Sequence, residues 1–354
     1  MSEPDCAFTP PARFLLVAGA FVVVVAGLKA ASDLITPFLL AIFLAVLVQP
    51  PLNYLRERAF PGWASMLIVV ALLVALGGGL IGLLTSSLND FNTNLPEYQQ
   101  RLRQMSSDLA LWLDGVGIQI SRETMNSLIN PARTLGFAGD LVRGLGGVLT
   151  NAVLILLTVV FLLFEGRSLP AKLRAILPAP EVSLKSLHQM MQTINHYTLI
   201  KVNTSLLTGL LIWFWLSWLG LDFAAMWAVL AFLLNFVPTI GSVIAAVPAV
   251  LIALVKLNLQ AAVLAAIGYL VVNFLVGNLI EPRVMGRGLG LSTLVVFVSL
   301  IFWGYVLGLV GMFLSVPLTM ALKIAFSTNP QTQYLAILLG PGVEQSTVML
   351  GEDQ

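Results

Sequence analysis

Residues 224–255 read AAMWAVLAFLLNFVPTIGSVIAAVPAVLIALV, and this stretch decides what kind of fold the chain can adopt. It contains no charged residue, and it is too long for one membrane span of about 20 residues and too short for two. Near its middle, Pro238 lacks an amide hydrogen and Gly241 tolerates positive φ, so a regular helix should break there. We expect either a helical hairpin that enters a membrane and returns, or one long helix kinked by proline and glycine.

A second stretch of the same kind occupies residues 291–326. Glycines lie near its middle, at Gly304, Gly308 and Gly311. Each stretch also contains a glycine followed six or seven residues later by a proline, which indicates a weak internal repeat: Gly241 with Pro248, and Gly311 with Pro317. If the helix between the two stretches crosses the membrane once, the two hairpins enter from opposite faces, as in many secondary transporters.

The composition supports a membrane protein along the whole chain. Hydrophobic residues make up 58% of the sequence and charged residues 10%, against roughly 25% charged residues in a soluble domain. Apolar runs of spanning length occur at residues 14–31, 34–48, 63–84, 146–164, 206–219, 224–255, 261–280 and 291–326. We therefore predict an all-α, polytopic transmembrane protein with about eight membrane elements, two of them broken hairpins.

Basic residues set the expected orientation, because short loops rich in Lys and Arg stay in the cytoplasm. Arg56 and Arg58 mark one such loop, and residues 165–203 form another. Both termini should then be cytoplasmic.

The chain is expected to divide into six parts in order. The expected parts are N-terminal membrane helices (1–88), an extracytoplasmic helical segment (89–144), a membrane helix (145–164), a cytoplasmic loop with an amphipathic helix (165–203), a C-terminal transport core (204–326) and a cytoplasmic tail (327–354).

The outer segment contains an apolar seam with alternating steps of three and four residues, which is typical of a helix that packs on another helix. The seam consists of Leu95, Tyr98, Leu102, Met105, Leu109, Trp112 and Val116. Its cover is expected to be a later helix of the same segment, beginning after Ser121 or Asn130, or else a neighbouring subunit.

Several function classes are excluded by what the sequence lacks. The net charge is +1, which offers no field for nucleic acid, and the single cysteine, Cys6, cannot build a thiolate metal site within one chain. No Gly-Lys dipeptide occurs, so a phosphate-binding GxxxxGK[ST] loop is missing. We expect no cofactor, no metal and no enzymatic activity, and a transporter would draw its energy from a gradient or from a partner.

Neutral polar residues inside the apolar runs are the candidates for a solute path, because they can hydrogen-bond a neutral solute without a fixed charge. These candidates are Asn235, Thr239, Ser242, Asn273 and Asn278, with Pro238 and Gly241 shaping the hairpin tip. No expected span has a carboxylate near its centre, which favours a neutral solute over cation/proton exchange. Ser and Thr in membrane helices also commonly bond their own backbone, so packing is the alternative interpretation.

Three stretches then resemble the autoinducer-2 exporter family of bacterial transporters: residues 219–254, residues 273–324 with their Glu281-Pro282-Arg283 and Gly286 core, and FLLFEGRSL at 161–169. The resemblance implies a multi-pass inner-membrane protein that forms a homo-oligomer such as a pentamer. It also implies export of a small quorum-sensing signal or a related metabolite. Some relatives resemble sodium/proton antiporters, and a non-transporting membrane scaffold is a further alternative.

The last expectation concerns the end of the helix at 261–280. Pro282 should end this helix, because it cannot continue the hydrogen-bonding pattern. Glu281 and Arg283 are then expected to form an ion pair at its cytoplasmic end. Gly286, together with Gly304, Gly308, Gly311 and Pro317, would allow the final hairpin to move, so these residues are assigned a gating or structural role.

Overall fold

The computed structural model describes residues 10–58, 60–116, 151–166, 180–238, 241–285, 290–328 and 331–341, with isolated positions between them. Within these ranges every regular element is a helix, so the all-α prediction is confirmed. Among the described residues, five helical segments are long and apolar enough to cross a membrane, and four shorter apolar helices accompany them. The prediction of a polytopic membrane protein is therefore confirmed as well.

The chain begins with two helices that meet at a bend at Ala31, α1 (Pro10–Ala30) and α2 (Ser32–Leu47). The third helix, α3 (Gln49–Glu57), starts at the paired prolines, which occupy its first turn. Proline is tolerated there because the first amide groups of a helix have no partner within the helix.

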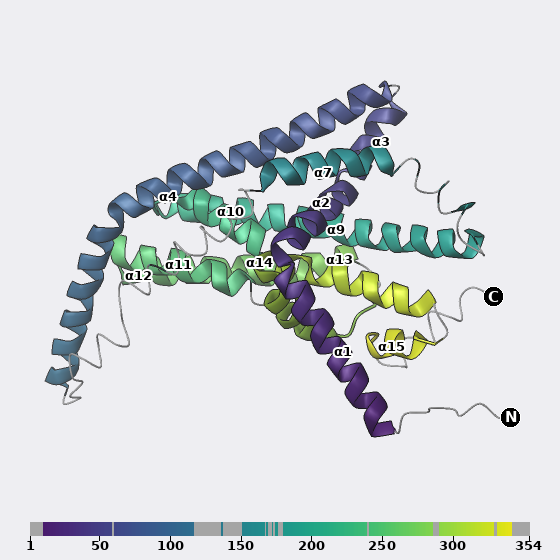
Figure 1. Cartoon of the computed structure of the whole chain (residues 1–354). Helices are drawn as coiled ribbons and strands as arrows, with labels where there is room; N and C mark the ends of the chain where they lie inside the picture. Colours follow the sequence, from purple (N-terminus) through teal and green to yellow (C-terminus); the bar gives the residue numbers. More distant parts are fainter. Residues whose placement is uncertain are drawn as a thin grey trace.

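Helix α4 (Gly62–Gly115) joins two parts that the sequence suggested were separate. The expected span and the outer seam form one helix, with Pro96 inside it, and the helix bends along its length (Figure 1). Tyr98 and Leu102 of the seam are buried against residues 221–255, whereas Val116 is exposed. The first half of the seam is thus covered by a part of the same chain that we did not expect, and residues 121–135 lie outside the described part.

The next helices are α7 (Ala152–Glu165) and α9 (Pro180–Trp218). Helix α9 is continuous through the stretch that we expected to be a cytoplasmic loop with an amphipathic helix. The polar residues before the apolar run 206–219 therefore belong to the same helix as the run itself. Several of them, including Thr198 and Lys201, are buried in the helical bundle.

The first hairpin consists of α10 (Ala224–Leu234) and α11 (Gly241–Lys256), which pack in one core cluster with α4, α9 and α12. Its tip requires a glycine, because a Cβ added at Gly241 would lie 1.8 Å from the carbonyl oxygen of Leu234. The backbone at Gly241 approaches α10 more closely than any side chain permits.

The second hairpin is α14 (Thr293–Thr328), which is broken at Gly308 with φ of 66° and ψ of −147°. Trp303 Nε1 donates to Thr319 Oγ1 at 3.2 Å. Residues sixteen apart in a straight helix would be separated by about 24 Å, so the two halves lie side by side. Gly311 repeats the role of Gly241, since a Cβ there would lie 2.0 Å from the carbonyl oxygen of Trp303.

Between the hairpins the chain forms α12 (Leu259–Asn273), the π-helix η1 (Phe274–Ile280) and α13 (Glu281–Met285). The expectation that the helix ends before Pro282 is wrong, because the helical path continues to Met285. The backbone N–H of Glu281 donates to the carbonyl of Val276, which gives the wider π turn just before the proline. Pro282 then falls in the first turn of α13, where its missing amide hydrogen does little harm. The chain ends with α15 (Gln333–Leu338).

Candidate functional site

A cavity of about 680 Å³ lies where α9, the first hairpin, the α12–η1–α13 path and the second hairpin come together. We call it the amide cavity, because three asparagines line it. Its lining is Tyr197, Lys201, Asn235, Val237, Pro238, Ser242, Val243, Leu270, Asn273, Phe274, Gly277, Asn278, Glu281, Val296 and Val316.

The predicted solute-path residues converge on this cavity, although they are spread over two elements in the sequence. Those that line it are Asn235, Pro238 and Ser242 from the first hairpin, and Asn273 and Asn278 from the α12–η1 path. Gly241 lies at the hairpin tip beside Ser242. Thr239 and Gly286 lie outside the described residues.

The predicted gating residues are divided between the cavity and its surroundings. Glu281 lines the cavity, and Pro317 follows the lining residue Val316 directly. Pro282 and Arg283 are exposed in α13. The remaining residues of this group shape the second hairpin: Gly304, Gly308 and Gly311.

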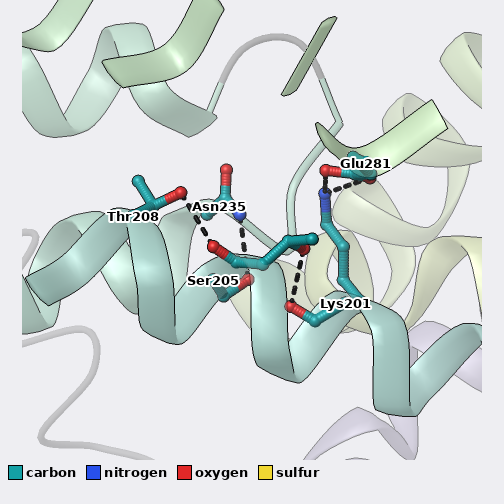
Figure 2. Close-up of polar contacts among 6 residues, drawn as sticks. Lys201, Ser205, Thr208, Asn235 and Glu281 are labelled. Carbon is teal, nitrogen blue, oxygen red and sulfur yellow. Dashed lines mark hydrogen bonds and ion pairs between the residues drawn. The ribbon is translucent and has the colours of Figure 1, made fainter. Parts of the chain in front are cut away.

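Glu281 forms an ion pair, but its partner differs from the expected one. Lys201 Nζ of α9 lies 2.8 Å from Oε1 and 3.0 Å from Oε2 of Glu281 (Figure 2). The two side chains are 7% and 17% exposed. Arg283 forms no ion pair with any residue in the described ranges, so the expected Glu281–Arg283 pair is wrong. The physical reason is geometric: residues two apart on a helix point in different directions, whereas Lys201 faces Glu281 from a neighbouring helix.

Lys201 belongs to a polar face on α9 with steps of three and four residues. The buried members of this face are Thr198, Lys201, Thr204, Ser205 and Thr208. Asn235 at the tip of the first hairpin donates from Nδ2 to Ser205 Oγ at 2.9 Å (Figure 2). This bond ties the hairpin tip to α9 next to the ion pair.

The other hydroxyl groups mostly bond their own helix, as the packing interpretation expects. Thr204 and Thr208 donate to carbonyl groups three and four residues earlier in α9. Ser299 and Ser315 in the second hairpin do the same. These hydroxyl groups are occupied by the backbone of their own helix. The asparagines and the Lys201–Glu281 ion pair are therefore the more distinctive polar groups of the site.

Lys201 and the other polar residues of α9 were not identified from the sequence. The apolar run that predicts this span begins at residue 206, and Lys201 was placed in a cytoplasmic stretch. A signal was nevertheless present, because Thr198, Lys201, Ser205 and Thr208 share one face of a helix whose other positions are largely apolar. A search for polar residues at helical spacing, rather than for apolar runs alone, would have found them.

The π-helix η1 contributes directly to the cavity. Asn273, Gly277 and Glu281 line it at steps of four residues, and Asn278 lines it five residues after Asn273, a step that fits the wider π turn. A π turn is wider than an α turn, and such turns are frequent at functional sites. Here it brings an additional amide to the same side as the carboxylate.

Residues 18–331 match the sequence profile described as AI-2E family transporter. The chain belongs to this family. Escherichia coli K12 contains the AI-2 transport protein TqsA, 37% identical over 92% of this chain and 95% of that protein.

Two further relatives of this AI-2E family member are named as putative transport proteins. One is YhhT of Escherichia coli K12, 40% identical over 94% of this chain and 96% of the relative. The other comes from Haemophilus influenzae Rd and is 38% identical over 93% of this chain and 96% of the relative. The family and these names indicate a membrane transporter rather than an enzyme.

Proposed function

We propose that this family member exports a small, neutral, hydrogen-bonding solute such as autoinducer-2 or a related metabolite through the amide cavity, without ATP. The observation that carries the proposal is the convergence of Asn235, Asn273 and Asn278 on one cavity. Amide groups both donate and accept hydrogen bonds, so they match the hydroxyl and carbonyl groups of such a solute.

The size of the cavity fits this solute class. Cavities for small molecules typically measure about 300–1,000 Å³, and this one measures about 680 Å³. Lys201 and Glu281 neutralise each other within it, so the cavity has polar groups without a net fixed charge. A neutral solute can therefore enter without an unpaired counter-charge.

We propose an inner-membrane location with both termini in the cytoplasm, in line with the basic loops. Asp222 and Lys256 at the base of the first hairpin would then face outward, and α13 would face the cytoplasm. The two hairpins would enter from opposite faces of the membrane.

A thiol introduced at the exposed Arg283 in a Cys6→Ser chain should react with an impermeant reagent from the cytoplasmic side alone. Reaction from the outer side alone would contradict this topology.

We also propose a homo-oligomer, such as the pentamer that the family resemblance implies. Several parts of the single chain are apolar and exposed, including α1, on which Phe14, Phe21 and Val23 are all exposed. Lipid and neighbouring subunits can both cover such faces. Mass measurement of the detergent-solubilised protein tests this point, and a monomer at all protein concentrations would contradict it.

The function itself is tested by solute flux in liposomes that contain the purified protein, with autoinducer-2 as the probe. We expect flux above that of protein-free liposomes, down the concentration gradient and without ATP. Flux equal to that of protein-free liposomes would contradict the proposed substrate class.

A second candidate function is cation/proton antiport, which is favoured by one observation: Glu281 is a carboxylate inside the cavity, paired with a buried Lys201. Ionisable residues at membrane depth commonly mark ion pathways. Glu281→Gln retains size and hydrogen bonding but cannot titrate. If this variant loses proton-dependent flux and retains proton-independent exchange, antiport replaces neutral export.

A further inference from the structure

A second cavity, of about 520 Å³, lies at the tip of the second hairpin. We call it the tip cavity. Its polar lining comes from the turn between α1 and α2 and from the start of α7: Lys29, Ser32, Asp33, Thr36 and Asn151. Residues 305–310, around the break at Gly308, form the opposite wall. Lys29 Nζ lies 3.4 Å from the centre of the Tyr305 ring, which holds the turn against the hairpin.

An aromatic cluster joins the two hairpins close to both cavities. Phe236, at the tip of the first hairpin, lies 4.3 Å from Phe313 of the second, measured between ring centres. Phe43 of α2 meets Phe313 edge to face at 5.3 Å. Phe236, Phe43, Val310 and Leu314 are all buried in this cluster. We call the three phenylalanines the aromatic partition.

The aromatic cluster adjoins both cavities. Phe236 is the chain neighbour of Asn235 and Val237, which both line the amide cavity. Val310 belongs to the cluster and Leu40 packs against it, and both of these residues also line the tip cavity. One group of apolar side chains therefore adjoins the two polar cavities.

We propose that the two cavities are successive binding compartments of one path for a neutral, hydrogen-bonding solute, and that the aromatic partition closes the path between them. This inference rests on the proposed function. The tip cavity, with its hydroxyl, amide and carboxylate groups, is assigned here as the second solute site. A polar solute cannot pass close-packed phenylalanine rings, because it would lose its hydrogen bonds there.

The hairpin tips provide the movement that opens the partition. Phe236 lies in the non-helical turn before Gly241, and Phe313 follows the break at Gly308 by five residues. Segments next to such breaks can shift without disrupting a whole helix, and discontinuous helices serve this purpose in transporters. Separation of the tips would then connect the compartments.

The experiment measures the access of an impermeant thiol reagent to each cavity in sealed vesicles of defined orientation. Cys6→Ser provides a background without thiols, and single cysteines replace Ser242 in the amide cavity and Thr36 in the tip cavity. We expect Ser242→Cys to react from the cytoplasmic side and Thr36→Cys from the outer side, each at least about tenfold faster than from the opposite side. Equal rates from both sides at both positions would show that no partition exists.

Phe313→Ala then tests the partition itself, with Phe236→Ala as an independent variant on the other hairpin. Either change should reduce the sidedness of labelling at both positions by about tenfold. Phe91→Ala is the matched control, since Phe91 is a buried phenylalanine in a different aromatic group. Unchanged sidedness in both partition variants, or an equal loss in Phe91→Ala, would overturn the proposal. Because labelling does not require transport, flux through the unsubstituted protein reports separately on the proposed function.

Discussion

At the scale of single residues, the Lys201–Glu281 pair is the most unusual feature of the molecule. A lysine and a glutamate that are mostly shielded from water lose hydration, and only a close, well-bonded pair offsets that loss. Lys201 reaches both carboxylate oxygens of Glu281, so the pair is well formed. The pair lines the amide cavity, so it belongs to the wall of the proposed solute path, and it also packs α9 against α13.

Lys201→Met should destabilise the protein, because Glu281 would be left without its counter-charge. Loss of one member of a buried ion pair typically costs about 3–5 kcal/mol. Thermal unfolding of the detergent-solubilised protein would measure the change. The double variant Lys201→Met/Glu281→Met should recover much of the loss. Lys172→Met is the control, because its pair with Glu165 is more than half exposed, and exposed pairs contribute little to stability. Equal effects at Lys201 and Lys172 would contradict a buried pair.

Gly241→Ala should be destabilising as well, although alanine normally favours a helix over glycine by about 0.5–1 kcal/mol. The added Cβ would meet the carbonyl oxygen of Leu234, which is backbone and cannot rotate away. Gly78→Ala in α4 is the control, because nothing lies within 4 Å of its Cβ position. We expect a lower unfolding temperature for Gly241→Ala and an unchanged or higher one for Gly78→Ala. The same result for both variants would contradict the close approach.

The two kinds of site residue differ in how well the sequence could predict them. Asn235, Asn273 and Asn278 are conspicuous, because each is a polar residue inside an otherwise apolar run. Lys201 is not, because a lysine at the edge of an apolar run is typical of a segment that leaves the membrane. Glu281 was singled out, but its partner lies eighty positions away in the sequence, and no local pattern connects the two.

At the scale of elements, proline and glycine made the two hairpins predictable, since both residues disrupt regular helix geometry in known ways. The lengths of α4 and α9 were not predictable from apolar runs. Polar residues continue each of these helices beyond its apolar part, and helix propensity does not depend on hydrophobicity. The π-helix η1 was also missed, because it arises from the accommodation of Pro282 within a path that continues to Met285.

The fold-back of α14 predicts a disulfide between Gly304→Cys and Met312→Cys in a Cys6→Ser chain. A Cβ at Gly304 would lie 2.8 Å from Met312 Cγ, so the two positions face each other. In a straight helix, residues eight apart would be separated by about 12 Å, far beyond the roughly 3.8 Å between the Cβ atoms of a disulfide.

Mild oxidation followed by thiol counting would detect the bond. The pair Val298→Cys/Val306→Cys is the control, because it has the same spacing but lies within the first half of α14. A disulfide in the test pair alone is the expected result, and the absence of a disulfide from both pairs would contradict the fold-back of α14.

At the scale of the whole molecule, the two hairpins meet through Phe236 and Phe313 and border two polar cavities. The sequence indicated that the hairpins exist and that they are related by a weak repeat. It could not show that their tips touch, nor that the asparagines of separate elements share one cavity, because both facts depend on tertiary packing, in which α9 contacts both hairpins. The convergence of these elements is what makes a solute path the central claim.

The most direct test of this claim is to fill the amide cavity and measure flux. Ser242→Cys in a Cys6→Ser chain would be modified with a bulky maleimide, and autoinducer-2 flux in liposomes would be compared before and after modification. Val296→Cys, on the opposite wall, provides an independent position, and the 80% exposed Val153→Cys on α7 is the control. We predict that modification of either cavity position reduces flux to that of protein-free liposomes, while modified Val153→Cys retains its flux. Undiminished flux through fully modified Ser242→Cys and Val296→Cys would contradict the assignment of this cavity as the solute path.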